Sequence, residues 1–187
     1  MPEEHFLNDY HQSLQAQLVE LCTSAGLLQG RLLECPDVDD AFEKLLTGYL
    51  NDAIPEITLY PTVALGWAMY LGMAVAHLWD DDWAHHSALP DLYASIRDVR
   101  GFDAMDEHVR ETLLGFSPDS RSYADCERIV QRCAQAALRR IDRAGIDSLN
   151  PLAFRLYVRS VQALFNIGVS VELTRLGYKM EQIPPSC

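Results

Sequence analysis

The chain has 187 residues, of which 49% are hydrophobic and 22% are charged, a composition typical of a folded protein with a sizeable core. Its formal net charge of −12 argues against sequence-independent binding to nucleic acid and against docking on anionic lipid, because both need clustered lysine and arginine. We therefore expect this acidic chain to have protein, small-molecule or cation partners, and we expect neither nucleic acid nor a membrane.

Two helices are predicted in the first third of the chain. Apolar side chains recur at helical spacing over residues 5–25, which predicts a first helix. Pro36 suits the first turn of a second helix, whose apolar face includes Val38 and Tyr49. Pro55 bounds this second helix.

The third predicted helix is the most apolar segment of the chain. Residues 57–79 carry no charge and are apolar on every side of a helix, which indicates a segment that is buried all round. Pro61 suits the first turn, so we expect a buried central helix over about residues 61–83. A membrane span is disfavoured, because the flanks are acidic and no lysine or arginine stands close by. One face repeats small side chains every four residues, which lets another helix approach closely: Ala64, Ala68, Gly72 and Ala76.

The remainder of the chain continues as helices separated by short turns. Pro90 is expected to start a short fourth helix, and a fifth helix follows it. Ser117-Pro118 is a helix-start signal, a capping hydroxyl followed by proline, and it predicts the beginning of the sixth helix. Asn150-Pro151 predicts the start of the last long helix in the same way.

No alternating strand pattern, linker or repeat separates these helices. We therefore predict one all-α domain over residues 1–187, a bundle of about seven helices around the buried central helix. Residues 178–187 are expected to form a flexible tail.

The cysteines indicate a cellular location. They are odd in number and contain no Cys-x-x-Cys pair, and the N-terminus lacks the basic start and apolar stretch of a signal peptide. Both features favour a reducing, cytoplasmic location. Cys126 and Cys133 share one face of a helical stretch, so we expect both to point into the core as small hydrophobic side chains.

Three aspartates follow the central helix, where carboxylates are disfavoured because the carbonyls of a helix C-terminus carry partial negative charge. If the helix continued through them, His77, Asp81 and His85 would share one face within an arc of about 80°. Imidazole and carboxylate groups suit a divalent transition metal, which makes His77, Asp81, Asp82 and His85 the candidate metal ligands. The simpler interpretation, which we favour, ends the helix near Trp79 and lets an aspartate cap the following turn.

A second candidate donor set combines His108 with Glu107 or Glu111, which are neighbours on a helix. The chain lacks the paired Glu-x-x-His motifs of di-iron bundles and the His-Glu-x-x-His motif of zincins. It also lacks the Gly-x-Ser-x-Gly, Walker and Gly-x-Gly-x-x-Gly motifs of hydrolases and nucleotide-binding enzymes. These absences favour a non-catalytic protein and leave the catalytic residues unassigned.

The last predicted helix carries a narrow polar stripe on an otherwise apolar surface. We favour the interpretation that the stripe is the solvent-facing edge of a nearly buried helix. Alternatively, it lines an internal pocket with Tyr70 of the central helix, where an arginine binds a ligand carboxylate or pairs with Asp81. The residues of the stripe are Arg155, Arg159, Gln162, Asn166 and Ser170, and the first four, together with Tyr70, are the candidate ligand-binding residues.

Three functions remain open from the sequence. The one we favour is a non-catalytic interaction or regulatory module that self-associates, for example as a homodimer, through apolar helices, the groove of small side chains and exposed aromatic residues. The first alternative is a metal-binding, metal-dependent enzyme centred on the candidate ligands. The second is a small-molecule binder that uses the polar stripe. The aromatic residues expected at the surface are Trp79, Trp83 and Tyr93.

Overall fold

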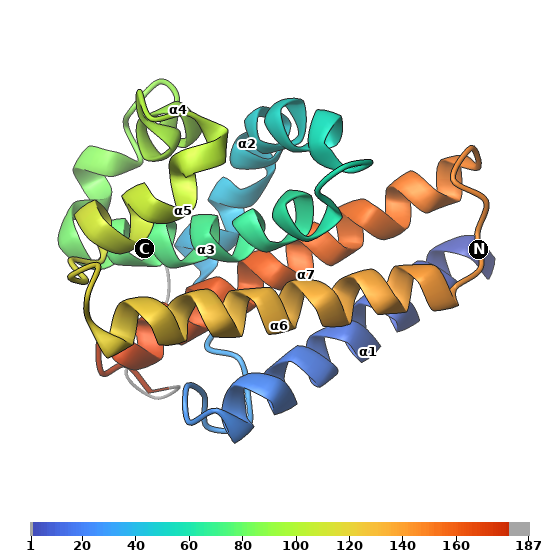
Figure 1. The fold of residues 1–187 in the computed structure, drawn as a ribbon, viewed down its shortest axis with the longest axis horizontal. Coiled ribbons are helices and arrows are strands. Elements are labelled where there is room, and N and C mark those ends of the chain that lie inside the picture. The colour runs from blue at the N-terminus through green and yellow to red at the C-terminus, as the bar shows by residue number, and fades with distance from the viewer. Residues whose placement is uncertain (1, 180–187) are drawn as a thin grey trace.

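Helices make up almost all of the regular structure (Figure 1). The structure is a computed structural model that describes residues 2–179, and this part of the chain contains seven α-helices and no strand. The all-α fold predicted from the sequence is confirmed. The α-helices are α1 (Pro2–Ser24), α2 (Pro36–Ala53), α3 (Pro61–His86), α4 (Leu92–Arg97), α5 (Met105–His108), α6 (Arg121–Arg143) and α7 (Pro151–Arg175), with 3₁₀ turns at Ile54–Glu56 and Phe102–Ala104 and a π-helical turn at Val109–Leu113.

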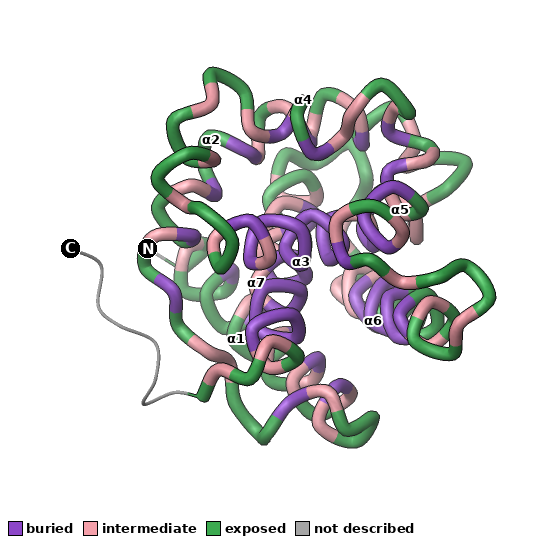
Figure 2. Tube along the Cα trace, turned by 90° about the vertical axis from the view of Figure 1, so that its left-hand side faces the viewer, coloured by how far each residue is buried: buried purple, intermediate pink, exposed green. Residues whose placement is uncertain are grey.

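Two long helices, α3 and α7, run side by side through the centre of the molecule (Figures 1 and 2). Near their starts, the Tyr157 hydroxyl donates a hydrogen bond of 2.9 Å to the Ala64 carbonyl. Near their ends, Nδ1 of His77 lies 3.1 Å from Oε2 of Glu172. Because residues in the same order along both helices meet, α3 and α7 are parallel.

Helix α1 covers one side of this central pair and runs in the same direction. The hydroxyls of Tyr10 and Ser160 are 2.7 Å apart, and further along the amide of Asn166 donates to the side-chain oxygen of Gln15 over 3.0 Å. Helix α6 runs in the opposite direction: Cys126 near its start contacts Met73 in the middle of α3, with 3.7 Å between the sulfurs, whereas Ala134 further along α6 lies beside Gly66 earlier in α3. Helices α2, α4 and α5 close the remaining side of α3 in Figure 1.

The close approach of α3 and α7 depends on two glycines. A methyl group added to Gly72 would collide with the backbone carbonyl of Phe165, and one added to Gly168 would collide with the carbonyl of Met69. Backbone therefore packs directly on backbone at this crossing. Gly72, one of the four small residues of the groove predicted along the central helix, is where α7 makes this close approach, so the groove is not free for another chain at that point.

Helix α3 is buried along most of its length, as Figure 2 shows. By length and composition it could cross a membrane, and it is the only helix of residues 2–179 for which this holds. However, 72% of its most apolar 18-residue window is buried inside the bundle, as in the core helix of a soluble protein. The prediction of a buried central helix is confirmed.

Some predicted helix starts are correct and others are displaced. Asn150 caps α7 by accepting from the amide of Leu152 over 2.9 Å, as expected. Helix α6 does not begin at Ser117-Pro118, because Ser117 instead forms a turn that accepts from Ser120, and Ser120 is the cap. Likewise α4 is capped by Asp91, and does not start at Pro90.

The C-terminal segment begins differently from the expectation. Tyr178, predicted to lie in a flexible tail, donates from its hydroxyl to Asp80 over 2.6 Å and packs its ring on Trp79. The remainder of the predicted tail, residues 180–187, lies outside the described residues. The expected exposure of aromatic side chains is also wrong in one case, because Tyr93 is buried and donates to Asp52 over 2.7 Å.

Candidate functional site

The structure separates the side chains proposed as metal ligands. Helix α3 contains non-helical backbone angles at Asp82 (φ −158°, ψ 83°), so the last turn is rotated relative to the rest of the helix. Oδ1 of Asp82 accepts from the amide of His85 over 3.2 Å and caps this last turn. Asp81 then lies 3.0 Å from His86 rather than between two imidazoles, and His77 faces α7 instead.

These contacts match the capping interpretation, with the break three residues later than Trp79. The arc that grouped the candidate ligands assumed a continuous helix, and the rotation at Asp82 removes that assumption. Within residues 2–179, no group of three histidine, cysteine, aspartate or glutamate side chains is placed to hold a metal ion.

The second candidate donor set is also dispersed. His108 is buried, and its Nδ1 lies 3.7 Å from Oδ2 of Asp98, beyond hydrogen-bond distance. Glu111 accepts from Arg100 over 3.2 Å, while Glu107 is exposed. None of these groups converges on a common point with the others.

The polar stripe of α7 packs against α1. Arg155 pairs with Glu3 and Glu4, and Arg159 donates to Glu4 over 2.6 Å. The pairing of an arginine with Asp81 is therefore not formed, because both arginines are held by the first turn of α1. Further along the stripe, Asn166 borders a groove of about 630 Å³ between α1, α7 and residues 30–34. Gln162 is half-buried.

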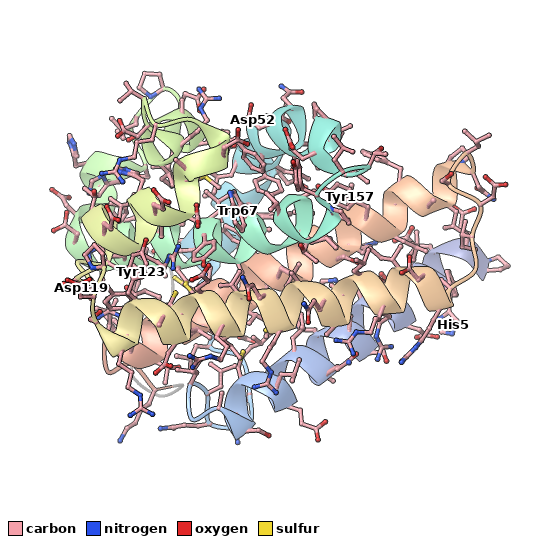
Figure 3. All side chains as sticks on the ribbon, viewed as in Figure 1. His5, Asp52, Trp67, Asp119, Tyr123 and Tyr157 are labelled. Atoms are coloured by element: carbon pink, nitrogen blue, oxygen red, sulfur yellow. The ribbon has the colours of Figure 1, made fainter. Side chains whose placement is uncertain are left out.

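Tyr70, expected beside the stripe, lies on the other side of α3. The π-helical turn brings Arg110 into the core, where its guanidinium carbon is 3.9 Å from the ring centre of Tyr123 and 5.5 Å from that of Tyr70. The Arg110 guanidinium also donates to the Asp106 carboxylate over 2.8 Å. Figure 3 places Tyr123 at the start of α6, facing the helices above it. The positive charge of Arg110 is therefore paired with Asp106 and packed between two tyrosine rings. These contacts hold the π-helical turn against α3 and α6.

A buried carboxylate that the sequence pattern did not single out lies near the C-terminal end of α7, far from Arg155 and Arg159. Glu172 is 1% exposed, and its Oε2 lies 3.1 Å from His77 and 2.7 Å from Nη2 of Arg175. Nε of Arg175 donates to the other oxygen, so the guanidinium grips the carboxylate with two hydrogen bonds. Removing either charge would leave the other without its partner in a partly dehydrated place.

Glu172 and Arg175 line a pocket of about 360 Å³, which is within the usual range for small-molecule sites. The walls come from the segment after α1, from α3, from the segment before α6, and from α6 and α7 (compare Figure 1). The lining is mixed, and its polar and charged side chains are Ser122, Asp125, Glu172, Thr174 and Arg175. The carboxylate of Asp125 is paired with Arg128 over 2.6 Å. The apolar side chains are Leu27, Met73, Leu114, Phe116, Ile129 and Val171.

We call this whole cavity the Arg175 pocket. Contacts with neighbouring groups hold its arginine in place. The guanidinium lies over the ring of Phe116, 5.0 Å from its centre, and the side chain remains 39% exposed. Hydrogen bonding to Glu172 raises the pKa of Arg175, so the group stays charged. Burial raises the pKa of Cys126 to about 12, so this thiol of the pocket is protonated and is a poor nucleophile. The pocket is therefore suited to binding rather than to covalent chemistry at sulfur.

The sequence contained a signal for this site. Glu172 is the only charged residue between Arg159 and Arg175, and that arginine follows it by one helical turn. An acidic residue on a helix that is otherwise buried needs a partner, and Arg175 at i+3 and a histidine on the facing helix provide it.

Comparison of the chain with protein-family models, with curated proteins and with solved structures finds no match. The function is therefore argued from the geometry of the Arg175 pocket.

Proposed function

We propose that this protein is a non-catalytic helical binding protein whose ligand is a small molecule with an apolar body and one carboxylate. The site is the Arg175 pocket. The observation that carries this proposal is a guanidinium that is fixed by a buried carboxylate through Nε and Nη2 and belongs to a side chain lining the pocket.

The guanidinium supplies the recognition of charge. Nε and Nη2 of Arg175 are held by Glu172, whereas Nη1 has no hydrogen bond to any residue between 2 and 179. A guanidinium offers five N–H donors in a rigid fork, and a carboxylate is its best-matched partner. Because Phe116 and Glu172 already orient the group, little conformational entropy is lost when a second carboxylate binds.

The apolar walls supply most of the binding free energy, because an alkyl or aromatic ligand body loses its contact with water there. The protonated thiol of Cys126 forms part of this surface and is not activated by a base. An overall charge of −12 repels anions, which makes a locally placed arginine necessary for an anionic ligand.

Isothermal titration calorimetry with octanoate tests the proposal, with octanol as the probe that lacks the carboxylate. We expect octanoate to bind more tightly by roughly ten- to a hundredfold, the value of one charge-assisted hydrogen bond of about 1.5–3 kcal/mol. Arg175→Gln should reduce octanoate binding to the level of octanol. Arg155→Gln, an exposed arginine at the other end of the same helix, is the matched control and should bind as the wild type does.

Equal affinity for octanoate and octanol, or equal losses in the two arginine variants, would contradict the proposal. Circular dichroism of each variant establishes that it is folded before binding is compared.

Self-association is the second candidate function, and exposed apolar side chains support it. Six large ones lie near the starts of α1 and α7 and in the segment between α2 and α3, all on the right-hand side of Figure 1. A symmetric dimer through this side would remove them from water. They are Phe6, Ile54, Leu59, Tyr60, Leu149 and Phe154.

Analytical ultracentrifugation over a range of protein concentrations tests this second candidate. We expect a dimer that dissociates in the double variant Leu59→Ser/Phe154→Ser. Val99→Ser is the control, because Val99 is 96% exposed but lies in the segment between α4 and α5. A wild-type protein that is a monomer at all concentrations would exclude self-association.

The expected cytoplasmic location is part of the same proposal and is supported by the four free thiols among residues 2–179.

A further inference from the structure

Two cysteines from distant parts of the chain are in direct contact. The sulfurs of Cys22, in the last turns of α1, and Cys133, in the middle of α6, are 3.7 Å apart. Both side chains are completely buried. The other two cysteines of residues 2–179 have different neighbours, because Cys126 contacts Met73 and Cys35 stands at the start of α2.

The geometry requires only a small movement to join the two sulfurs. A disulfide bond is about 2.05 Å long, so the sulfurs must approach by roughly 1.7 Å. Cys22 is close to the end of α1, which stops at Ser24 and is followed by Gly26 with a left-handed φ of 79°. The end of a helix opens and shifts more readily than its middle. Cys22 can therefore move toward Cys133, which is held within a long helix.

The two thiols differ in their acidity. Contact with the Cys133 thiol, helped by the nearby Arg132, lowers the pKa of Cys22. The same contact and burial raise the pKa of Cys133. A pair of this kind contains one thiol that becomes a thiolate first and one that keeps its proton until later, as in other reactive thiol pairs.

We propose that Cys22 and Cys133 are a redox modification site, a thiol pair that hydrogen peroxide converts into a disulfide between α1 and α6. The Cys22 thiolate attacks one peroxide oxygen, the O–O bond breaks, and a sulfenic acid forms with release of hydroxide, which takes up a proton to become water. The sulfur of Cys133 then attacks the sulfur of Cys22, the S–O bond breaks, and the thiol proton leaves with the hydroxide as a second water. The two thiols are oxidised by two electrons in total and one peroxide is reduced to two waters.

The site selects a small oxidant. Because neither sulfur reaches the surface, any oxidant reaches the pair only when the end of α1 opens. Peroxide is close to water in size and needs a smaller opening than a bulky disulfide reagent does. The resulting bond would connect residues 111 positions apart, as the contact between them shows. A crosslink over so long a loop restricts the unfolded chain strongly and raises the melting temperature.

Peptide mapping after peroxide treatment of the full chain tests this inference. The expected product is a crosslinked peptide pair containing Cys22 and Cys133, with a loss of two hydrogen atoms from the protein and a melting temperature several degrees higher. Dithiothreitol should reverse both changes. Cys22→Ala and Cys133→Ala should abolish them, and Cys126→Ala, another buried thiol on α6, should retain them.

Mapping of the wild-type protein gives a result even where a variant folds poorly. Oxidation of Cys22 to sulfinic acid without joining Cys133, or two thiols that remain free for alkylation after unfolding, would overturn the inference. A crosslinked protein that melts no higher than the reduced one would contradict the claim that a disulfide between α1 and α6 stabilises the fold.

Discussion

The crossing of α3 and α7 at Gly72 can be tested by adding a single methyl group. In Gly72→Ala, the new Cβ would overlap the carbonyl of Phe165, and the amide of Val169 is only 3.0 Å from the same position. Both neighbours are backbone, so no side chain can rotate away and the two helices must separate. Overpacking in a core costs about 1–3 kcal/mol, and a clash with backbone belongs at the upper end of that range or beyond it.

Alanine also has a higher helix propensity than glycine, which restores about 1 kcal/mol. We therefore expect Gly72→Ala to lower the free energy of unfolding by about 2 kcal/mol or more. Gly66→Ala is a matched control on the same helix, because its Cβ would meet Cγ1 of Val130 and Cβ of Ala134 at 3.2 Å and a backbone atom, the Val130 carbonyl oxygen, only at 3.9 Å. A displacement of a few tenths of an ångström relieves these contacts, so this variant should remain within about 1 kcal/mol of the wild type.

Urea denaturation followed by circular dichroism measures both variants. The reasoning predicts a lower midpoint for Gly72→Ala than for Gly66→Ala, with similar slopes. Equal midpoints for the two variants would refute direct backbone contact between α3 and α7.

Three further predictions concern the Arg175 pocket and the last turn of α3. Arg175→Leu should cost about 3 kcal/mol because it leaves Glu172 buried without its guanidinium, whereas Glu172→Leu should cost about 1–2 kcal/mol because the released arginine reaches water; urea denaturation compares them. The pKa of Cys126 is raised to about 12, above the value of about 8.5 in an unfolded chain, so its contribution to stability is complete below pH 8.5 and is lost as the pH rises toward 12. Cys126→Ala should therefore flatten the loss of unfolding free energy over that range, and an unchanged pH profile would contradict this. Asp82→Ala should cost about 1 kcal/mol by removing the cap of the last turn of α3, and Asp81→Ala, which is exposed, should cost less than about 0.5 kcal/mol; equal melting temperatures would contradict the capping role.

The architecture was predictable because local signals and burial agree along most of the chain. Pro61 and the Asn150-Pro151 pair start α3 and α7 where capping chemistry expects them. The uncharged run 57–79 and its repeat of small residues identified both the central helix and the face on which another helix packs. These features depend on the composition of a segment, which the sequence displays directly.

The wrongly predicted helix boundaries occur where two nearby residues are equally suited to begin or end a helix and the surrounding structure selects one of them. Ser117 and Ser120 can each cap a helix, and the turn between them selects the second. The break at Asp82 follows from one residue with non-helical angles, which the pattern of charges does not locate.

The Arg175 pocket could be predicted only in part. The isolated charge of Glu172 in an apolar helix is visible in the sequence and indicates a buried partner. The histidine that meets it, His77, was singled out for a different role, because its distance from Glu172 depends on the parallel pairing of α3 and α7. Pocket walls that come from five segments of the chain follow from tertiary packing and cannot be read from any one of them.

A structure of the protein in complex with octanoate is the most direct test of the proposed site. The account predicts the carboxylate within hydrogen-bond distance of Nη1 of Arg175, with the alkyl chain between Met73 and Ile129. An alkyl chain bound elsewhere, for example in the groove beside Asn166, or a carboxylate turned away from Arg175, would contradict it.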